Sequence, residues 1–438
     1  MSYAPSLRRR GEALALAATL ALPVAVLAIS RAYTVNIGYY DDWQWTPMIL
    51  DMRHGTIPWA SMWALHNNHR IVVPDVVALA IARFGSWSSV RETTFSVGIA
   101  VLTQLVWYAV VARAVPAQRR VAAFFLISLL VFSLAQSENW IWGFQIAWFI
   151  ANLAIAAMVY CLTFRGGVRW AAAALACALI AAHSIAYGLD ALLAGTVVAA
   201  LERPRSKVKL VAWIVATVAV WGSYAHDYTR GLTYAPASAG LERAAQTIVY
   251  ALAFLGAPVA RSLGPAVCAL VGAIALGAYA WCIVAWLRGD RSDGGRRHAV
   301  LVVLATGLVP VLCALQIAYA RLWEGPATAL SGRYVMASSL LWIVVIVAGA
   351  AGRVTLPRTK AAGAVAVAVC LAGWAGAQWT GFDDIRSRAL DIYAAGQALP
   401  SYATATADEL KWLFPAEVFA PMLDAAKEGP FAEPARAR

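Results

Sequence analysis

Long apolar runs separated by short polar segments follow one another from the start of the chain to about position 379. Several runs approach the roughly 20 residues that a helix needs to cross a lipid bilayer. Open sheet edges cannot lie in lipid, so we expect helices and predict an all-α polytopic membrane protein. We place a first helix that ends near Ser30 and ten later crossings, about 11 in all, at 92–112, 121–136, 143–164, 170–185, 188–201, 210–225, 266–287, 299–318, 333–351 and 361–379.

The first apolar run follows three arginines at 8–10, as the apolar part of a signal peptide would. It is longer than that part usually is, and no convincing small-residue cleavage site follows it. We therefore expect a retained first helix.

Composition supports a membrane protein. The 438 residues are 61% hydrophobic and 13% charged, and the mean hydropathy is +0.66, whereas soluble domains are about 45–50% apolar and about 25% charged. The six cysteines all lie inside apolar runs, which argues against disulfides and against a thiolate metal site.

Charge divides the connecting segments into two sets. Six short segments, at 8–12, 113–120, 165–169, 202–209, 288–297 and 352–360, carry 19 of the 35 Lys and Arg residues but only 4 of the 23 acids. The positive-inside rule assigns them to the cytoplasm. We therefore predict an inner (plasma) membrane protein with a cytoplasmic N-terminus and an extracytoplasmic C-terminus. The net charge of +12 reflects topology, so it does not indicate a nucleic-acid partner.

Two regions need separate treatment. Residues 246–262 are apolar enough to cross, but a crossing there would move the basic 288–297 segment outside. We expect a re-entrant or interfacial helix broken by Gly256 and Pro258; an ordinary crossing with an irregular charge pattern is the alternative. The chain then divides into a transmembrane domain at 1–379 and a small extracytoplasmic tail at 380–438, with short amphipathic helices at 408–414 and 416–427.

The outer segment 32–91 carries paired acids just beyond the first helix. Asp41 and Asp42 are flanked by aromatic residues that include Tyr40 and Trp43. One acid could deprotonate a hydroxyl while the other orients it, both could help to hold a hard cation, or one could cap the following helix. The aromatic neighbours favour a sugar-binding or active-site edge.

A His/Asn/Arg cluster at 66–70 lies within an expected interfacial helical hairpin at 58–84. His66 and His69 would share one helical face beside Arg70. Two histidines without a third ligand are a weak metal site. A lipid-linked phosphate suits an arginine fork with histidine donors better, and an interfacial anchor with polar groups in headgroup water is the alternative.

Further polar residues are expected at the outer mouth of the bundle. Glu138 follows the third helix, where it could bind an acceptor, help to hold a metal ion, or simply cap a helix. Arg333 and Tyr334 open a later helix, whose positive end would help bind a phosphate; an arginine that snorkels to headgroups is the alternative. Arg321 lies in the preceding loop. In the turn at 183–190, His183 or Asp190 could face the cavity, but we expect the polar groups to satisfy the backbone of the turn.

Taken together, these residues resemble the GT-C superfamily of bacterial integral-membrane glycosyltransferases. The resemblance is carried by Asp41-Asp42-Trp43, the 66–70 run, residues 139–145, the turn at Gly188, and Ser331-Gly332-Arg333-Tyr334. It covers most of the membrane part and none of the tail. Relatives often have HNEHR in the second motif, whereas Asn68 stands here in place of the acid, which weakens the case for a metal at this motif.

The resemblance implies a GT-C-like bundle and an inverting transfer of sugar from a polyprenyl-phosphate donor. The acceptor would be a hydroxyl of a glycan or lipid on the extracytoplasmic face. No cofactor is certain, although a divalent cation sometimes assists such enzymes. The implied roles are catalytic for Asp41, Asp42 and Glu138, donor-binding for His66, His69, Arg70, Arg321, Arg333 and Tyr334, and acceptor- or sugar-binding for Tyr40, Trp43, Asn67, Asn139 and Gln145.

The rival class is a flippase or permease for a lipid-linked or anionic substrate. It would explain the helix count and the outer arginines. It would not explain why polar residues gather on one side, since carriers place their binding groups near the midplane. An outer-face glycan polymerase would share the donor chemistry. No Walker A motif is present in the sequence, which argues against an ATP-driven pump.

Overall fold

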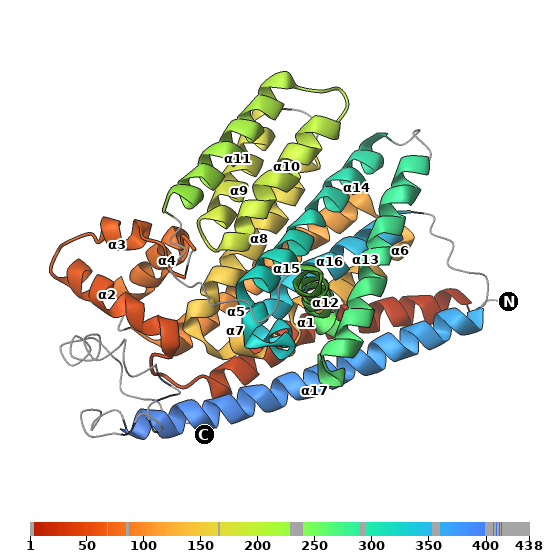
Figure 1. Ribbon diagram of the computed structural model, residues 1–438. Coiled ribbons are helices and arrows are strands. Elements are labelled where there is room, and N and C mark those ends of the chain that lie inside the picture. The colour runs from red at the N-terminus through yellow and green to blue at the C-terminus, as the bar shows by residue number, and fades with distance from the viewer. Residues whose placement is uncertain are drawn as a thin grey trace.

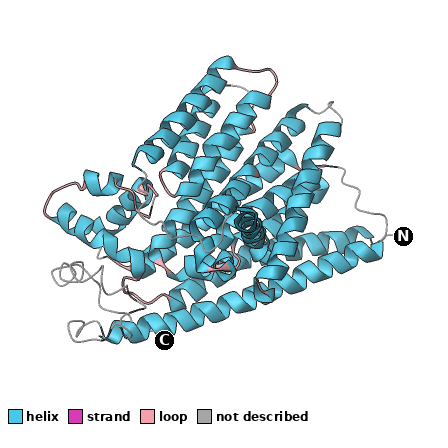
Figure 2. Ribbon diagram, viewed as in Figure 1, coloured by secondary structure: helices cyan, strands magenta, loops and turns pink. Residues whose placement is uncertain are grey.

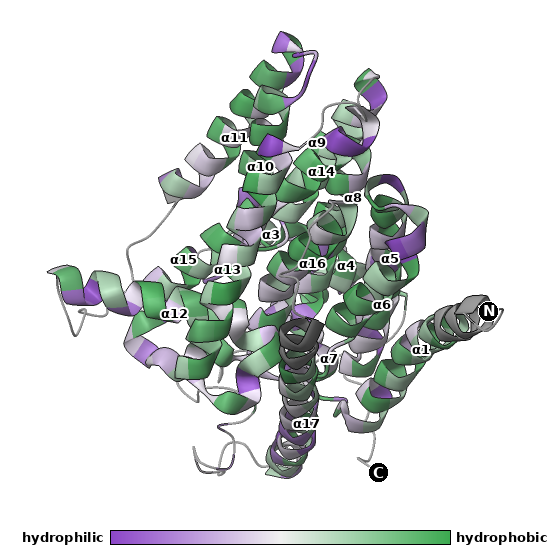
Figure 3. Ribbon diagram, turned by 90° about the vertical axis from the view of Figure 1, so that its right-hand side faces the viewer, coloured by the Kyte–Doolittle hydropathy of each residue, from purple (hydrophilic) through white to green (hydrophobic). Residues whose placement is uncertain are grey.

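The computed structural model describes residues 4–67, 69–84, 87–164, 167–227, 240–289, 294–352 and 360–398, together with positions 406, 409, 411 and 413. Every regular element in these residues is a helix (Figures 1 and 2). Apolar residues dominate the helices, and polar residues gather at their ends and in the connecting segments (Figure 3). This distribution is the one expected when helix sides face lipid or one another.

The first half of the chain contains the helices α1 to α10. Their bounds are α1 Ala4–Tyr33, η1 Tyr40–Gln44, α2 Trp45–Arg53, α3 Trp59–Trp63, α4 Val72–Arg83, α5 Ser89–Ala114, α6 Ala117–Val131, α7 Ser137–Ile141, η2 Gly143–Gln145, α8 Ile146–Leu162, α9 Val168–Ala182, η3 Ala186–Gly188 and α10 Leu189–Leu201. The second half contains α11 Lys207–Asp227, α12 Gly240–Ala260, η4 Arg261–Leu263, α13 Pro265–Arg288, α14 Gly294–Thr306, α15 Leu308–Arg321, η5 Leu322–Glu324, η6 Pro326–Leu330, η7 Gly332–Tyr334, α16 Val335–Ala351 and α17 Lys360–Ala398.

Eight helical segments in the described residues are long and apolar enough to cross a membrane, at 13–33, 89–114, 143–162, 207–226, 240–263, 265–288, 294–324 and 332–351. Seven of them coincide with expected crossings, and the eighth is 240–263. The remaining four expected crossings fall on α6, α9 and α10, which have 15, 15 and 13 residues, and on the 39-residue α17. The chain is thus a multi-pass helical membrane protein, and the count of 11 crossings stays a prediction.

Helix α12 differs from the broken segment that the sequence suggested. The helix continues through Gly256 and Pro258 and ends at Ala260. Gly256 lies where α12 and α13 touch, because a Cβ there would sit 1.9 Å from the carbonyl oxygen of Cys268. The glycine therefore permits close packing and does not end the helix. Figure 1 shows α12 nearly end-on among helices seen from the side, so it runs across α13 to α16.

Helix α17 extends well beyond the expected end of the last crossing. It runs without interruption to Ala398, so the predicted boundary at 379 lies inside it. In Figure 1 it follows one side of the bundle, and the ring of its Phe382 contacts Tyr33 of α1, with ring centroids 5.6 Å apart. The expected amphipathic helices at 408–414 and 416–427 lie almost entirely outside the described residues.

Two large groups of buried side chains hold the bundle together. One joins α5 to α16 around residues such as Trp107, Phe254 and Val344. The other joins α1, the segment 34–88, α7, α8 and the second half of α17 around Trp43, Trp45 and Trp140. The second group fixes the polar segments at one end of the bundle. We call this the long-loop end, meaning the end where residues 34–88 lie.

Candidate active site at the long-loop end

The two paired acids have different environments. Asp42 is fully buried, and its carboxylate accepts hydrogen bonds from the backbone N–H groups of Tyr39 (3.0 Å) and Phe144 (2.8 Å). It thereby ties η1 to the start of η2. Burial raises the pKa of the Asp42 carboxyl, although the two backbone hydrogen bonds act against this rise. These contacts favour a structural role for Asp42.

Asp41 faces the other way and remains partly open. About 29% of its side chain is exposed, and its Oδ1 lies 3.6 Å from Nε2 of His66. The ring of His66 lies against Phe144, with centroids 5.1 Å apart, and Asn67 Nδ2 is 2.9 Å from His66 Nε2. Of the two acids, Asp41 is therefore the one that an acceptor could reach.

The histidines lie in a tight turn, so our expectation of a shared helical face was wrong. His66 and His69 exchange both backbone hydrogen bonds, at 2.8 and 2.7 Å, and Asn67 has a φ of 47°. Asn68 lies outside the described residues. Asparagine tolerates this left-handed conformation better than most residues. Because a right-handed helix needs a negative φ at every residue, the run cannot continue as a helix through Asn67. Helices α3 and α4 flank the turn, close to where the prolines predicted them.

His69 and Arg70 point into the fold. Burial and the charges of His66 and Arg321 lower the pKa of His69 to about 4, although Asp41 acts against this effect. The Arg70 guanidinium donates to the carbonyl oxygens of Trp63 and of Ser223 (3.1 Å) and stacks over the Trp63 ring. Because these contacts engage its fork within the protein, we leave Arg70 out of the proposed site.

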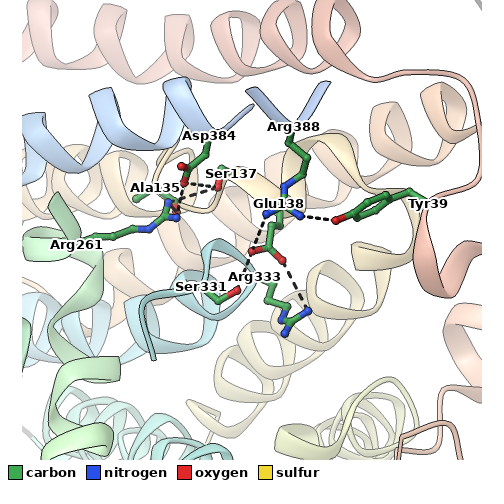
Figure 4. A network of polar contacts seen from close by, with 9 residues as sticks. All are labelled: Tyr39, Ala135, Ser137, Glu138, Arg261, Ser331, Arg333, Asp384 and Arg388. Carbon is green, nitrogen blue, oxygen red and sulfur yellow. Dashed lines mark hydrogen bonds and ion pairs between the residues drawn. The ribbon is translucent and has the colours of Figure 1, made fainter. Parts of the chain in front are cut away.

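A network of charged side chains surrounds Glu138 of α7 (Figure 4). Its Oε1 accepts a hydrogen bond from Ser331 Oγ (2.8 Å) and lies 3.7 Å from Nη2 of Arg388, while its Oε2 lies 3.9 Å from Nη1 of Arg333. Arg388 also donates to the hydroxyl of Tyr39. Burial alone would raise the pKa of Glu138, but Arg333, Arg388 and the Ser331 hydrogen bond lower it by more, so the group is ionised at neutral pH.

A second ion pair lies beside this network. Arg261 of η4 pairs with Asp384 of α17 and donates to the carbonyl oxygen of Ala135 (2.9 Å). Ser137 joins both partners at 3.4 Å. The pair therefore fixes α17 against α7 and η4, and this contact sets the position of Arg388.

The other predicted site residues are divided between this region and the core. Arg321 pairs with Glu324 at 2.5 Å. Tyr40 contacts the ring of Trp142, whereas Trp43 is buried against Trp87. Tyr334 is also buried, and the guanidinium of Arg333 lies 5.1 Å above its ring.

Asn139 and Gln145 are buried close to Glu138 along the chain. The Asn139 side-chain amide donates to the carbonyl oxygen of Arg333 at 3.3 Å. Asn139 Oδ1 and Gln145 Oε1 have no hydrogen-bond partner among the described residues. Both oxygens are buried, so this structure does not open them to a ligand.

Sequence reasoning missed Arg388, Arg261 and Asp384. The last span was expected to end at 379, so the charges of 383–388 were assigned to the small extracytoplasmic tail. A signal was present: Asp384 and Arg388 are four residues apart, a spacing that places them on one helical face. That spacing would have continued the helix into the site.

Within the described residues, no three His, Cys, Asp or Glu side chains converge in a way that could hold a metal ion. Comparison with models of protein families, with curated proteins and with solved structures found no match to the chain.

Proposed function

We propose that the protein is an inverting membrane glycosyltransferase of the GT-C type. It would move a sugar from a polyprenyl-phosphate donor to a hydroxyl of a glycan or lipid acceptor. The long-loop end would then face outward from the inner membrane. The observation that carries the proposal is a partly exposed acid, Asp41, at the same end of an apolar bundle as two arginines, Arg333 and Arg388, that share one carboxylate.

The arginine pair supplies the donor site. Arg333 and Arg388 together carry two positive charges against the one negative charge of Glu138, and this excess of one positive charge is uncompensated once Asp41 has taken a proton. Arg333 is also within electrostatic reach of Asp41. A phosphate that becomes more negative as its bond to the sugar breaks would be stabilised by this excess. Placing positive charge where negative charge develops is the strongest single catalytic effect available to such a site.

The step itself needs one base. Asp41 takes the proton from the acceptor hydroxyl, the oxygen attacks the anomeric carbon, and the bond from that carbon to the phosphate oxygen breaks. Polyprenyl phosphate leaves with the bonding electron pair. The single displacement inverts the anomeric centre. Asp42 holds η1, and therefore Asp41, in position.

The test is the replacement of Asp41 by asparagine, which keeps the shape but cannot accept the proton. Membranes containing the Asp41→Asn variant should transfer radiolabelled sugar from a polyprenyl-phosphate donor roughly 10²–10⁴-fold more slowly than the parent, the range of general-base catalysis. Thermal unfolding in detergent should remain near that of the parent.

Asp51→Asn is the matched control, because Asp51 is an exposed acid of the same segment and should retain full activity. If the Asp41→Asn variant transfers sugar at the parental rate, Asp41 is not the general base. If labelled lipid crosses the bilayer unchanged and no glycosidic bond forms, the protein is a carrier and the proposal fails.

A further inference from the structure

A residue near the C-terminus contacts the residue that precedes Asp41. The backbone N–H of Tyr40 donates a hydrogen bond to the carbonyl oxygen of Leu413 (2.6 Å). Leu413 lies beyond the end of α17 at Ala398, so almost the whole length of the chain separates the two partners. The sequence did not predict this contact, and the proposed mechanism does not use it.

The side chain of Leu413 is anchored in the core. It is fully buried, at 0% exposure, and belongs to the group of buried side chains that contains Trp43 and Trp45. Earlier in the same segment, the N–H of Thr406 donates to Glu409 Oε2 (2.7 Å), and the N–H of Glu409 donates to Thr406 Oγ1 (3.3 Å). This reciprocal capping is typical of the start of a helix. Leu413 is therefore held by its side chain as well as by its carbonyl oxygen.

The partner of Leu413 has an unfavourable backbone conformation. Tyr40 has a φ of 45°, which lies in the left-handed region that residues with a Cβ rarely adopt. Its ring packs against Tyr39 and Trp142, with centroids 4.7 and 6.2 Å away. Because Asp41 follows directly, the turn at Tyr40 sets the direction in which the chain enters η1 and the side on which Asp41 lies.

The C-terminal part of the chain holds the start of η1 at two consecutive residues. Arg388 donates to the hydroxyl of Tyr39 (Figure 4), and Leu413 accepts from the N–H of Tyr40. Arg388 also carries a charge that we assign to the donor site. The side chain of Leu413 has no polar group, so the contact that it makes with the site is one of position only.

We propose that Leu413 is a positioning residue for the general base. It stabilises the left-handed turn at Tyr40, and this turn keeps Asp41 where an acceptor hydroxyl can reach it. The inference rests on the proposed function, since it gives Leu413 a part in the same transfer. It also makes the C-terminal segment a component of the site, which would be incomplete without it.

The test combines hydrogen exchange with transfer kinetics on the purified full chain. In Leu413→Ala, the peptide that contains residues 39–44 should exchange its amide hydrogens roughly tenfold faster, whereas peptides from α5 should exchange as in the parent. The kcat for sugar transfer should fall about tenfold or more, because small displacements of a catalytic group are costly. The KM for the polyprenyl-phosphate sugar should change less than about twofold, because the donor arginines stay in place.

Two further variants serve as controls for Leu413→Ala. Leu413→Met conserves the side-chain volume and should keep most of the parental exchange and kcat. Leu390→Ala removes an exposed leucine of α17 and should change neither. Leu413→Val is a smaller deletion that should show the pattern of Leu413→Ala at reduced size, and it replaces that variant if Leu413→Ala does not fold.

Tyr40→Gly distinguishes positioning from general packing. Glycine adopts a positive φ without steric cost, so the turn should then depend much less on Leu413. In the Tyr40→Gly background, Leu413→Ala should lower kcat by less than about threefold. A loss caused by poorer packing alone would be equally large in both backgrounds.

Three results would overturn the inference. Leu413→Ala could leave the exchange of residues 39–44 unchanged, it could speed this exchange without lowering kcat, or its loss of kcat could be as large in the Tyr40→Gly background. Failure of the proposed function gives a different result, because Asp41→Asn would then transfer sugar at the parental rate whatever residue stands at position 413.

Discussion

At the scale of single residues, two residues that are adjacent in the sequence, Asp41 and Asp42, have different environments. Asp41 and Asp42 differ by one position, yet one is partly open beside His66 and the other is enclosed and bonded to two backbone N–H groups. The sequence identified the pair and left the base, cation and capping roles open. Only the fold decides which acid is reachable, because the turn of η1 sets the direction of each side chain.

The arginine pair gives a prediction at this scale. Arg388→Ala should raise the KM for a polyprenyl-phosphate sugar by tenfold or more and Arg388→Lys by less, since removing one partner of a buried charge pair costs about 2–5 kcal/mol. Arg333→Ala should behave in the same way. Steady-state kinetics in detergent would measure the KM of each variant.

Arg386→Ala provides the control for Arg388→Ala, because Arg386 is exposed on the same helix. An Arg388→Ala variant that unfolds at a lower temperature while its KM is unchanged would show that Arg388 only holds α17 in place.

A buried acid gives a prediction about pH. Burial raises the pKa of Asp75 to about 7, although the hydrogen bond from Trp45 Nε1 (2.8 Å) and the charge of His66 act against it. The folded protein therefore holds the proton more tightly than the unfolded chain. The protonated Asp75 carboxyl contributes its full stabilisation below about pH 4, and this stabilisation is lost as the pH rises toward 7.

Asp75→Asn should remove this loss, because the amide cannot ionise and its oxygen still accepts from Trp45. The variant should unfold near the parental temperature below about pH 4 and at a higher temperature at pH 8. A pKa that moves from 3.8 to about 7 bounds the gain in unfolding free energy at about 4 kcal/mol. Equal unfolding temperatures at pH 8 would show that Asp75 is not the group responsible.

At the scale of elements, close backbone contacts position α17. A Cβ at Gly381 would lie 2.0 Å from the carbonyl oxygen of Leu134, and one at Gly373 would lie 2.4 Å from that of Val259. Gly381→Ala should therefore push α17 away from the segment before α7 and displace Arg388. We expect a loss of about 1–3 kcal/mol in unfolding free energy and a larger loss of sugar transfer.

Gly277→Ala is the matched control, since a Cβ there meets nothing within 4 Å and alanine favours a helix. Thermal unfolding and transfer assays on both variants would test the contact. If Gly381→Ala equals Gly277→Ala in both assays, the packing of α17 does not set the site.

The sequence predicted elements well where one rule dominated and poorly where a partner decided the outcome. Apolar length alone located seven of the eight described helical segments that are long and apolar enough to cross a membrane. The structure of α12 depended on Gly256 meeting α13, and the length of α17 depended on its contacts with α7 and η4. Periodicity does not reveal such partners. The turn at His66 to His69 was also missed, because the sequence alone does not show that Asn67 has a left-handed backbone conformation.

At the scale of the whole molecule, we predict that the basic segments and the long-loop end lie on opposite sides of the membrane. The 202–209 segment carries four basic residues, and residues 34–88 carry the candidate site. The positive-inside rule then predicts that 202–209 is cytoplasmic and that the site is extracytoplasmic. The proposed function requires this orientation, because the acceptors of cell-surface glycans are outside.

Single cysteines test the orientation. Ser61 and Ser206 are both exposed, so Ser61→Cys and Ser206→Cys should react equally well once the membrane is opened. In intact cells, a membrane-impermeant maleimide should label the cysteine at 61 and spare the one at 206. Cys370, an exposed native cysteine, is replaced by alanine beforehand to lower the background. If the cysteine at 206 is labelled from outside and that at 61 is not, the site faces the cytoplasm and must use a donor presented there. Since a polyprenyl-phosphate sugar delivered outside could then not reach Arg333 and Arg388, the reversed pattern would overturn the proposed donor as well as the orientation.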